Sequence, residues 1–170
     1  MRKVLIGLGV MLSLGLFSAC SSDEGNELFK VRNFANSGCK SATRVGDEGG
    51  TLYDENEAIE VKGLKDGYLS INHKNALFNC EAGGFNIIAT IDGNVIKVTE
   101  KYNADAANCI CPYDLYCEVG PLADGDYTII IYQDATYDQA DAREHTRFNV
   151  SYKKDLNRIL HIVPDPMCTT

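Results

Sequence analysis

The sequence predicts an all-β domain, built as an antiparallel β-sandwich of about eight or nine short strands. Apolar and polar residues alternate over short stretches, and turn residues recur about every 8–12 positions. Helical periodicity is almost absent, which disfavours an α/β or all-α fold. The chain has 170 residues, so it is the size of one domain with a sizeable core.

Nine stretches have the composition expected of strands. The clearest hairpin joins residues 85–91 to 95–99 through Asp92-Gly93, a pair that favours a type I′ turn. Residues 46–50 are expected to form a turn, and residues 134–144 a polar, acidic loop. The expected strands are 58–62, 67–72, 76–80, 85–91, 95–99, 115–119, 127–132, 147–152 and 159–163.

The stretch from Cys109 to Tyr132 is the centre of this prediction. Residues 115–119 alternate as a half-buried strand, and residues 127–132 are β-branched or aromatic, as in a strand buried on both sides. A turn of six or seven residues separates the two strands. We therefore expect them to pair with each other in antiparallel fashion.

Tyr127 opens the second of these strands directly after Asp124-Gly125-Asp126. This arrangement is similar to the tyrosine corner of immunoglobulin-like sandwiches, in which the phenol hydroxyl bonds to the backbone a few residues upstream. The resemblance implies an immunoglobulin-like or related Greek-key topology, with Tyr127 as a structural residue. The alternative is an ordinary tyrosine in a hairpin strand.

The central third of the chain contains four short motifs, namely Phe78-Asn79-Cys80, Cys109-x-Cys111-Pro112-Tyr113-Asp114-Leu115, Gly120-x-Leu122 and Gly125-x-Tyr127. In these motifs it resembles small, uncharacterised surface lipoproteins of the Bacteroidota. The resemblance implies a fold and a cell-surface location, but it implies no activity.

The N-terminus has the features of a bacterial lipoprotein signal peptide. Arg2-Lys3 precede an apolar run from Val4 to Phe17, and Ser18-Ala19 precede Cys20. This ending is similar to a lipobox, although Phe17 stands where an aliphatic residue is usual. It predicts a signal peptide over 1–19, an acylated Cys20, a flexible tether over 20–36 and one domain over 37–170. The alternative is a soluble secreted protein in which Cys20 is an ordinary thiol.

Residues 21–24 (Ser-Ser-Asp-Glu) look like the acidic signal that sends such lipoproteins to the outer face of the outer membrane. The alternative is a solvated polar tether with no signal. Without Arg2 and Lys3, the 16 basic residues become 14 against 24 acidic ones, a net charge of −10. This charge disfavours nucleic acid as a partner, because nucleic-acid binding depends on basic side chains. The membrane partner is then the bilayer that holds the acyl chains of Cys20.

Six cysteines remain if Cys20 is acylated, and an even number in an exported domain predicts disulfide bonds. We expect Cys80–Cys109 and Cys39–Cys168, leaving Cys111 and Cys117 either bridged or as buried thiols. Zinc ligation by Cys80, Cys109, Cys111 and Cys117 is an alternative. It is disfavoured because C-x-C occurs only once and the other cysteines have no matching spacing. A catalytic redox pair is disfavoured because no C-x-x-C is present.

No catalytic or metal-ligating residue and no cofactor is assigned from the sequence. His73, His145 and His161 are far apart in the chain and match no metal or catalytic motif. A loop calcium site is an open alternative, with carboxylates drawn from Asp124, Asp126, Asp134, Asp138, Asp141 and Glu144.

These observations favour a non-enzymatic binding or accessory module, carried on the cell surface by an outer-membrane lipoprotein, with a protein or glycan ligand that the sequence does not identify. A small exported hydrolase is the main alternative. It requires several side chains to converge in one concavity, namely three or more of Asp114, Asp134, Asp138, Glu144 and His145.

Overall fold

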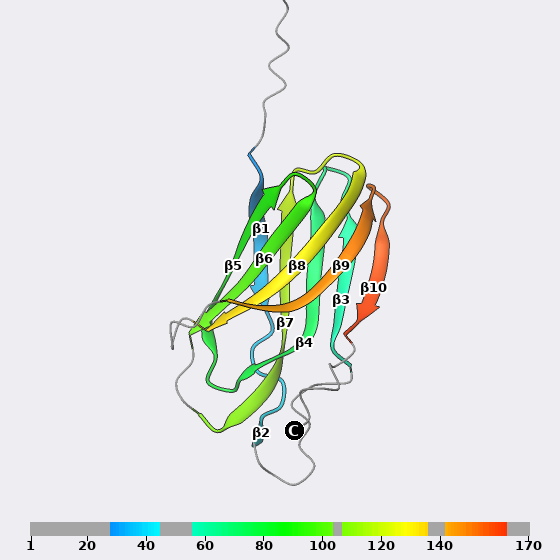
Figure 1. Cartoon of the computed structure of the whole chain (residues 1–170). Helices are drawn as coiled ribbons and strands as arrows, with labels where there is room; N and C mark the ends of the chain where they lie inside the picture. Colours follow the sequence, from blue (N-terminus) through cyan, green and yellow to red (C-terminus); the bar gives the residue numbers. More distant parts are fainter. Residues whose placement is uncertain (1–27, 45–55, 104–106, 136–141, 163–170) are drawn as a thin grey trace, which may run out of the picture.

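The computed structural model of the protein describes residues 28–44, 56–103, 107–135 and 142–162. These residues form ten strands in two facing sheets, so the predicted all-β sandwich is confirmed (Figure 1). Across the described ranges, we find no helix with the length and hydrophobicity needed to cross a membrane.

Each sheet draws strands from both halves of the chain. The first sheet has the order β1 (Lys30–Asn36), β7 (Cys109–Gly120), β4 (Leu69–Asn79), β3 (Ala58–Gly63) and β10 (Asn157–His161), with the short β2 (Thr43–Arg44) also paired to β7. The second sheet has the order β5 (Gly83–Asp92), β6 (Val95–Asn103), β8 (Gly125–Ala135) and β9 (Arg143–Tyr152).

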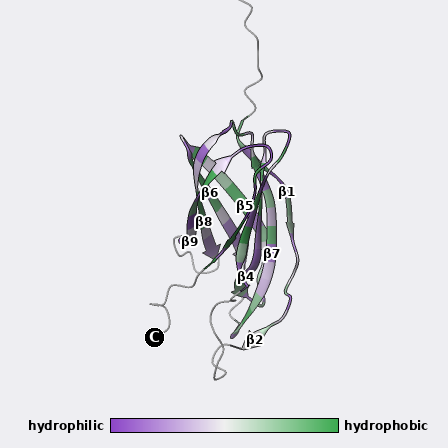
Figure 2. Ribbon diagram, turned by 90° about the vertical axis from the view of Figure 1, so that its right-hand side faces the viewer, coloured by the Kyte–Doolittle hydropathy of each residue, from purple (hydrophilic) through white to green (hydrophobic). Residues whose placement is uncertain are grey.

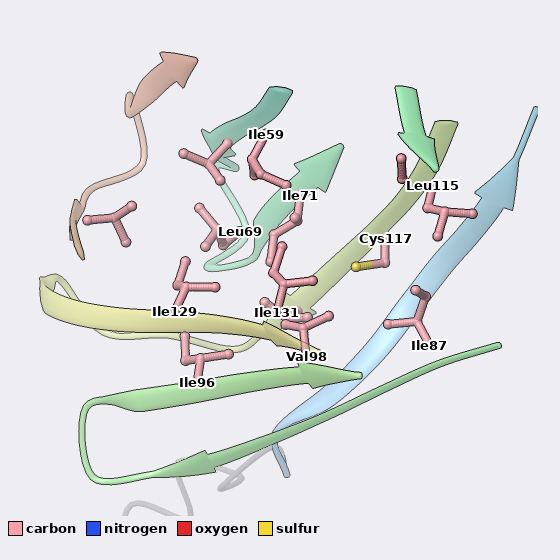
Figure 3. Packing of buried hydrophobic residues seen from close by; sticks show 14 of the residues in the cluster. Ile59, Leu69, Ile71, Ile87, Ile96, Val98, Leu115, Cys117, Ile129 and Ile131 are labelled. Atoms are coloured by element: carbon pink, nitrogen blue, oxygen red, sulfur yellow. The ribbon is translucent and has the colours of Figure 1, made fainter. Parts of the chain in front are cut away.

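The hydrophobic core fills the space between the sheets. Alternate residues of each strand point inward, which produces the alternating hydrophobic and hydrophilic bands along the ribbon in Figure 2. Each fully buried Leu, Ile or Val contributes about 1.5–3 kcal/mol to stability. The aliphatic centre of the core, seen in Figure 3, consists of Ile59, Leu69, Ile71 and Leu115 from the first sheet and Ile96, Val98, Ile129 and Ile131 from the second.

The strands β7 and β8 lie in different sheets, so the predicted antiparallel pairing between them is wrong. The chain leaves the first sheet at Gly120 and enters the second at Gly125, where β8 pairs with β9 on one side and runs parallel to β6 on the other. Parallel neighbours cannot be joined by a tight turn, and here β7 in the opposite sheet supplies the connection from β6 to β8. The expected burial of β8 on both faces holds at its centre, where Ile129, Ile130 and Ile131 are all buried.

Tyr127 lies just after this passage between the sheets. Its hydroxyl donates a hydrogen bond to the carbonyl oxygen of Ala123, four residues upstream, at 3.0 Å. The side chain also packs against the core, with its ring edge-on to Tyr152. The hydrogen bond expected of a tyrosine corner is therefore present, while the immunoglobulin-like subtype of the sandwich remains a prediction.

The folded domain begins earlier than the sequence suggested. Residues 30–36, assigned to the tether, form β1 at the edge of the first sheet, where Lys30 pairs with Gly120 and Asn36 with Leu115. Val31 and Phe34 pack against the core, which explains why this polar segment is ordered. Residues 1–27, and with them Cys20 and the predicted signal peptide, lie outside the described residues, as do the turn predicted at 46–50 and Cys168.

Two local predictions also need correction. The strands expected at 67–72 and 76–80 form the single strand β4, because a β-bulge between His73 and Ala76 absorbs the polar residues, with Asn75 at φ 54°. In the hairpin of β5 and β6, Asp92 pairs with Val95, so the turn residues are Gly93 and Asn94. Gly93 has φ 57°, and Asn94 is not among the described non-glycine residues with positive φ, a combination that fits a type II′ turn rather than type I′.

Candidate functional site

His73 occupies an inward-facing position of β4, in the middle of the protein. Leu69, Ile71 and His73 follow one another at every second residue, so all three point between the sheets. The imidazole is only 1% exposed. The strand alternation therefore carries a titratable ring into a core that is otherwise mostly apolar.

Two buried carboxylates contact the two nitrogens of this ring. Glu100 faces inward from β6, following Ile96 and Val98 at every second position, and its Oε1 lies 2.8 Å from Nδ1 of His73. Glu57 directly precedes β3, and its Oε1 lies 2.7 Å from Nε2 of His73. The two sheets thus each contribute one carboxylate, and the ring lies between them.

The protonation of His73 follows from this environment. Both ring nitrogens face carboxylate oxygens, so both donate and the ring is an imidazolium. Burial lowers the pKa of His73, but the opposing attraction of Glu100 and Glu57 outweighs it and raises the pKa to about 10. Burial likewise raises the pKa of Glu57, but hydrogen bonds from His145 and His73 outweigh this effect and lower it to about 2.

His145 reaches the same carboxylate from β9. Thr146 pairs with Ile131 and Glu144 with Tyr132, so His145 is the additional residue of a β-bulge. Its Nε2 lies 2.5 Å from Oε1 of Glu57, and its ring centroid lies 5.2 Å from that of His73. The His145 side chain is 23% exposed, so this ring forms the solvent-facing side of the group. We call Glu57, His73, Glu100 and His145 the His–Glu cluster.

The His–Glu cluster has both acid–base and metal-ligating chemistry. Glu57, His73 and His145 each offer one ligand atom within 4.8 Å of those of the other two, a donor set suited to a metal ion. Gln133 on β8 donates from Nε2 to the second oxygen of Glu100 at 3.5 Å. In the part of the chain that the structure covers, every buried side-chain nitrogen and oxygen has a hydrogen-bond partner.

The cysteines are structural rather than metal-binding. Cys80 and Cys109 form a disulfide bond, as predicted, with their Cα atoms 5.6 Å apart. Cys39 pairs with Cys111 and not with Cys168, because β2 lies against β7 and holds the two side by side. Cys117 is the free thiol among the described cysteines, and it is buried. The bridges overturn a cysteine-ligated metal site, which required Cys80, Cys109, Cys111 and Cys117 to be unbridged.

Four of the acidic residues considered for a hydrolase or a calcium site contact separate partners. Asp114 pairs with Lys40 at 2.5 Å, Asp134 with Lys101 at 2.9 Å, and Glu144 with Arg147 at 2.7 Å. Asp126 accepts a hydrogen bond from Ser151 at 2.6 Å. Asp138 and Asp141 lie outside the described residues. Among the described residues predicted for a hydrolase site, His145 is therefore the one that belongs to the His–Glu cluster.

The sequence did contain a signal for two members of the His–Glu cluster. Leu69-x-Ile71-x-His73 and Ile96-x-Val98-x-Glu100 each place a titratable residue at a position where the strand pattern demands an apolar one. Glu57 and His145 carry no such signal, since one precedes its strand and the other is in a bulge.

Comparison with known proteins supplies no relative: no protein family, no curated protein and no solved structure matches this chain.

Proposed function

We propose that the protein is an exported lipoprotein, anchored to a membrane through an acylated Cys20, whose sandwich acts as a non-enzymatic binding or accessory module at the cell surface. The signal-like N-terminus, the cysteine after Ser18-Ala19 and the acidic residues that follow support this proposal. The two disulfide bonds are typical of an oxidising compartment outside the cytoplasm.

The observation that carries the proposal is the cysteine that follows Ser18-Ala19 after the apolar run, and the start of β1 then determines how an anchored domain would be attached. Lys30, where β1 begins, pairs with Gly120 at one end of the sheet. Asn36 pairs with Leu115, which in turn pairs with His73, so the cluster lies five residues along β7 from Gly120, about 17 Å away at roughly 3.3 Å per residue. A membrane anchor before Lys30 would therefore join the domain at the end of the first sheet where β1 begins, with the cluster near the middle of the strands (Figure 1).

The test compares the full chain with Cys20→Ala in a Gram-negative host, and Cys168→Ala serves as a control that also removes one cysteine. Wild type and Cys168→Ala are expected to sediment with membranes and to carry acyl chains by intact mass, whereas Cys20→Ala is not. Protease added to intact cells should degrade the anchored domain if it faces outward. Wild-type protein that is released without acylation would contradict the anchor.

A further inference from the structure

We propose that Glu57, His73 and His145 form a binding site for one divalent transition-metal ion, with Glu100 as the outer carboxylate that orients His73. The inference rests on the geometry of the His–Glu cluster and holds whether or not the protein is membrane-anchored.

The positions of the donor atoms fit such an ion. Zinc forms bonds of about 2.0–2.2 Å to imidazole nitrogen and carboxylate oxygen, which places tetrahedral donors about 3.3 Å apart. In the metal-free protein, Oε1 of Glu57 lies 2.5 Å and 2.7 Å from the two Nε2 atoms, because hydrogen bonds occupy this space. Exchange of these protons for a metal ion therefore requires the donors to separate by about 0.6–0.8 Å.

The types of donor select the class of metal. Two imidazoles and one carboxylate suit zinc and other first-row transition metals, whereas calcium and magnesium prefer shells made entirely of oxygen. Among the described candidate calcium ligands, Asp134 pairs with Lys101, Glu144 with Arg147 and Asp126 with Ser151. We therefore assign the site to a transition metal.

Glu100 supplies an independent observation that favours a metal site. It holds Nδ1 of His73 at 2.8 Å, so Nε2 is the nitrogen directed toward Glu57 and His145. A ligating histidine usually donates its other ring N–H to a carboxylate, which fixes the ring and increases its basicity. Gln133 in turn contacts the second oxygen of Glu100.

The charges also balance around a divalent cation. Glu57 and Glu100 are buried, with 4% and 2% of their surface exposed, and together they carry two negative charges. Buried carboxylates are costly unless they are compensated. One divalent ion neutralises both, while both imidazoles ligate in their neutral form.

The site is open on one side. His145 is 23% exposed whereas His73 is 1% exposed, so an ion reaches the cluster past His145. Three protein ligands leave a fourth coordination position for water or for a donor from another molecule. The site is therefore suited to an exchangeable metal rather than to one sealed in the core.

The experiment titrates Zn²⁺ by calorimetry, and Co²⁺ by visible absorption, into the purified full chain stripped with a chelator. Wild type is expected to bind one equivalent and to unfold at a higher temperature with Zn²⁺. His145→Ala should remove this binding, while His161→Ala is the matched control because His161 is exposed on β10. Glu57→Gln, which keeps the shape of the side chain, should act like His145→Ala.

Glu100→Gln tests the orienting role. It is expected to weaken Zn²⁺ binding about 10–100-fold, as for other outer-shell variants, without abolishing it. The proposal is overturned if the folded wild-type protein shows no saturable binding of either ion. It is equally overturned if His145→Ala binds as tightly as wild type, or if His161→Ala loses as much affinity as His145→Ala.

Discussion

At the scale of single residues, Tyr127 holds the chain where it passes from one sheet to the other. Its hydroxyl bonds to the exposed carbonyl of Ala123, and one such hydrogen bond contributes about 0.5–1.5 kcal/mol. We expect Tyr127→Phe to lower the free energy of unfolding by about 1 kcal/mol in urea titrations. The matched control is Tyr132→Phe on the same strand, whose hydroxyl makes no hydrogen bond to the described backbone. An equal loss of unfolding free energy in both variants would show that the hydrogen bond from Tyr127 to Ala123 does not stabilise the protein.

The buried thiol of Cys117 makes the stability of the protein depend on pH. Burial raises the pKa of its thiol to about 12, with further contributions from the charges of Glu100 and Glu118. The folded pKa lies above the unfolded value of about 8.5, so the neutral thiol favours the folded state fully below about pH 8.5. This contribution is lost as the pH rises toward 12.

We therefore expect Cys117 to resist alkylation in the native protein at pH 8 and to react once the protein is denatured without reductant. Peptide mapping by mass spectrometry distinguishes Cys117 from every other cysteine. The stability of wild type should also fall more steeply than that of Cys117→Ala between pH 9 and 12, roughly the interval between the two pKa values. Rapid alkylation of the native protein would refute the burial of this thiol.

At the scale of elements, two bulges shape the candidate site. The bulge in β4 follows His73 and shifts the inward alternation by one residue, so that Ala76 and Phe78 face the core, and the backbone N–H of Asn75 donates to Oδ1 of Asp114 at 3.0 Å. The bulge in β9 frees His145 from the regular pattern and turns it toward Glu57. Bulges are common beside functional sites for this reason, since each redirects one side chain without disturbing the rest of its strand.

Gly63 packs closely against the backbone of the connection between β9 and β10. It ends β3, its N–H donates to the carbonyl of Leu156 at 2.9 Å, and a Cβ there would overlap the carbonyl oxygen of Lys153. We expect Gly63→Ala to lower the free energy of unfolding by at least about 1–3 kcal/mol. The backbone at Lys153 must move to make room for the added methyl group, and backbone is less free to move than a flexible side chain. Gly83→Ala at the start of β5 is the control, since a Cβ at Gly83 meets nothing within 4 Å. Thermal unfolding of both variants tests this, and similar melting temperatures would refute the close approach.

At the scale of the whole molecule, the two disulfide bonds join the first residues of β7, Cys109 and Cys111, to Cys80 and Cys39. Cys39–Cys111 spans 72 residues and Cys80–Cys109 spans 29. From loop entropy, removal of the longer bridge should cost about 4.4 kcal/mol and removal of the shorter about 3.6 kcal/mol. Paired Cys→Ala variants measured by urea unfolding check both values. The same stability in all variants, with and without reductant, would contradict bridges in the native protein.

The fold could largely be predicted because each strand must bury one face, and alternation is visible in a single sequence. The strand positions from Ala58 to Thr99 were therefore close to those observed. The placement of β8 could not be predicted, since the six or seven residues before Tyr127 suit either a hairpin or a crossing between sheets. Similarly, Cys39 meets Cys111 only because β2 lies on β7, a contact that depends on the complete sheet.

The candidate site was less accessible to prediction. His73 and Glu100 each break an apolar pattern, so their burial was detectable, but their contact joins opposite sheets and depends on how these pack. His145 reaches the site through a bulge that no motif encodes. The three proposed ligands, Glu57, His73 and His145, are separated by 16 and 72 residues in the chain, so no local spacing of ligands exists.

The bridge Cys80–Cys109 lies within the loop that Cys39–Cys111 closes. This arrangement constrains the order in which the bridges can form during synthesis. The ribosome produces Cys39 and Cys80 before either Cys109 or Cys111, the native partners of both. At about 5–20 residues per second, the wait between Cys80 and Cys109 lasts roughly 1.5–6 s. During that interval the only bridge that these four cysteines can close is Cys39–Cys80, which is absent from the native protein. The native pairs therefore form either by late closure or by thiol–disulfide exchange. Late closure requires an oxidant that acts slowly enough to leave Cys39 and Cys80 reduced, and exchange requires an active disulfide isomerase.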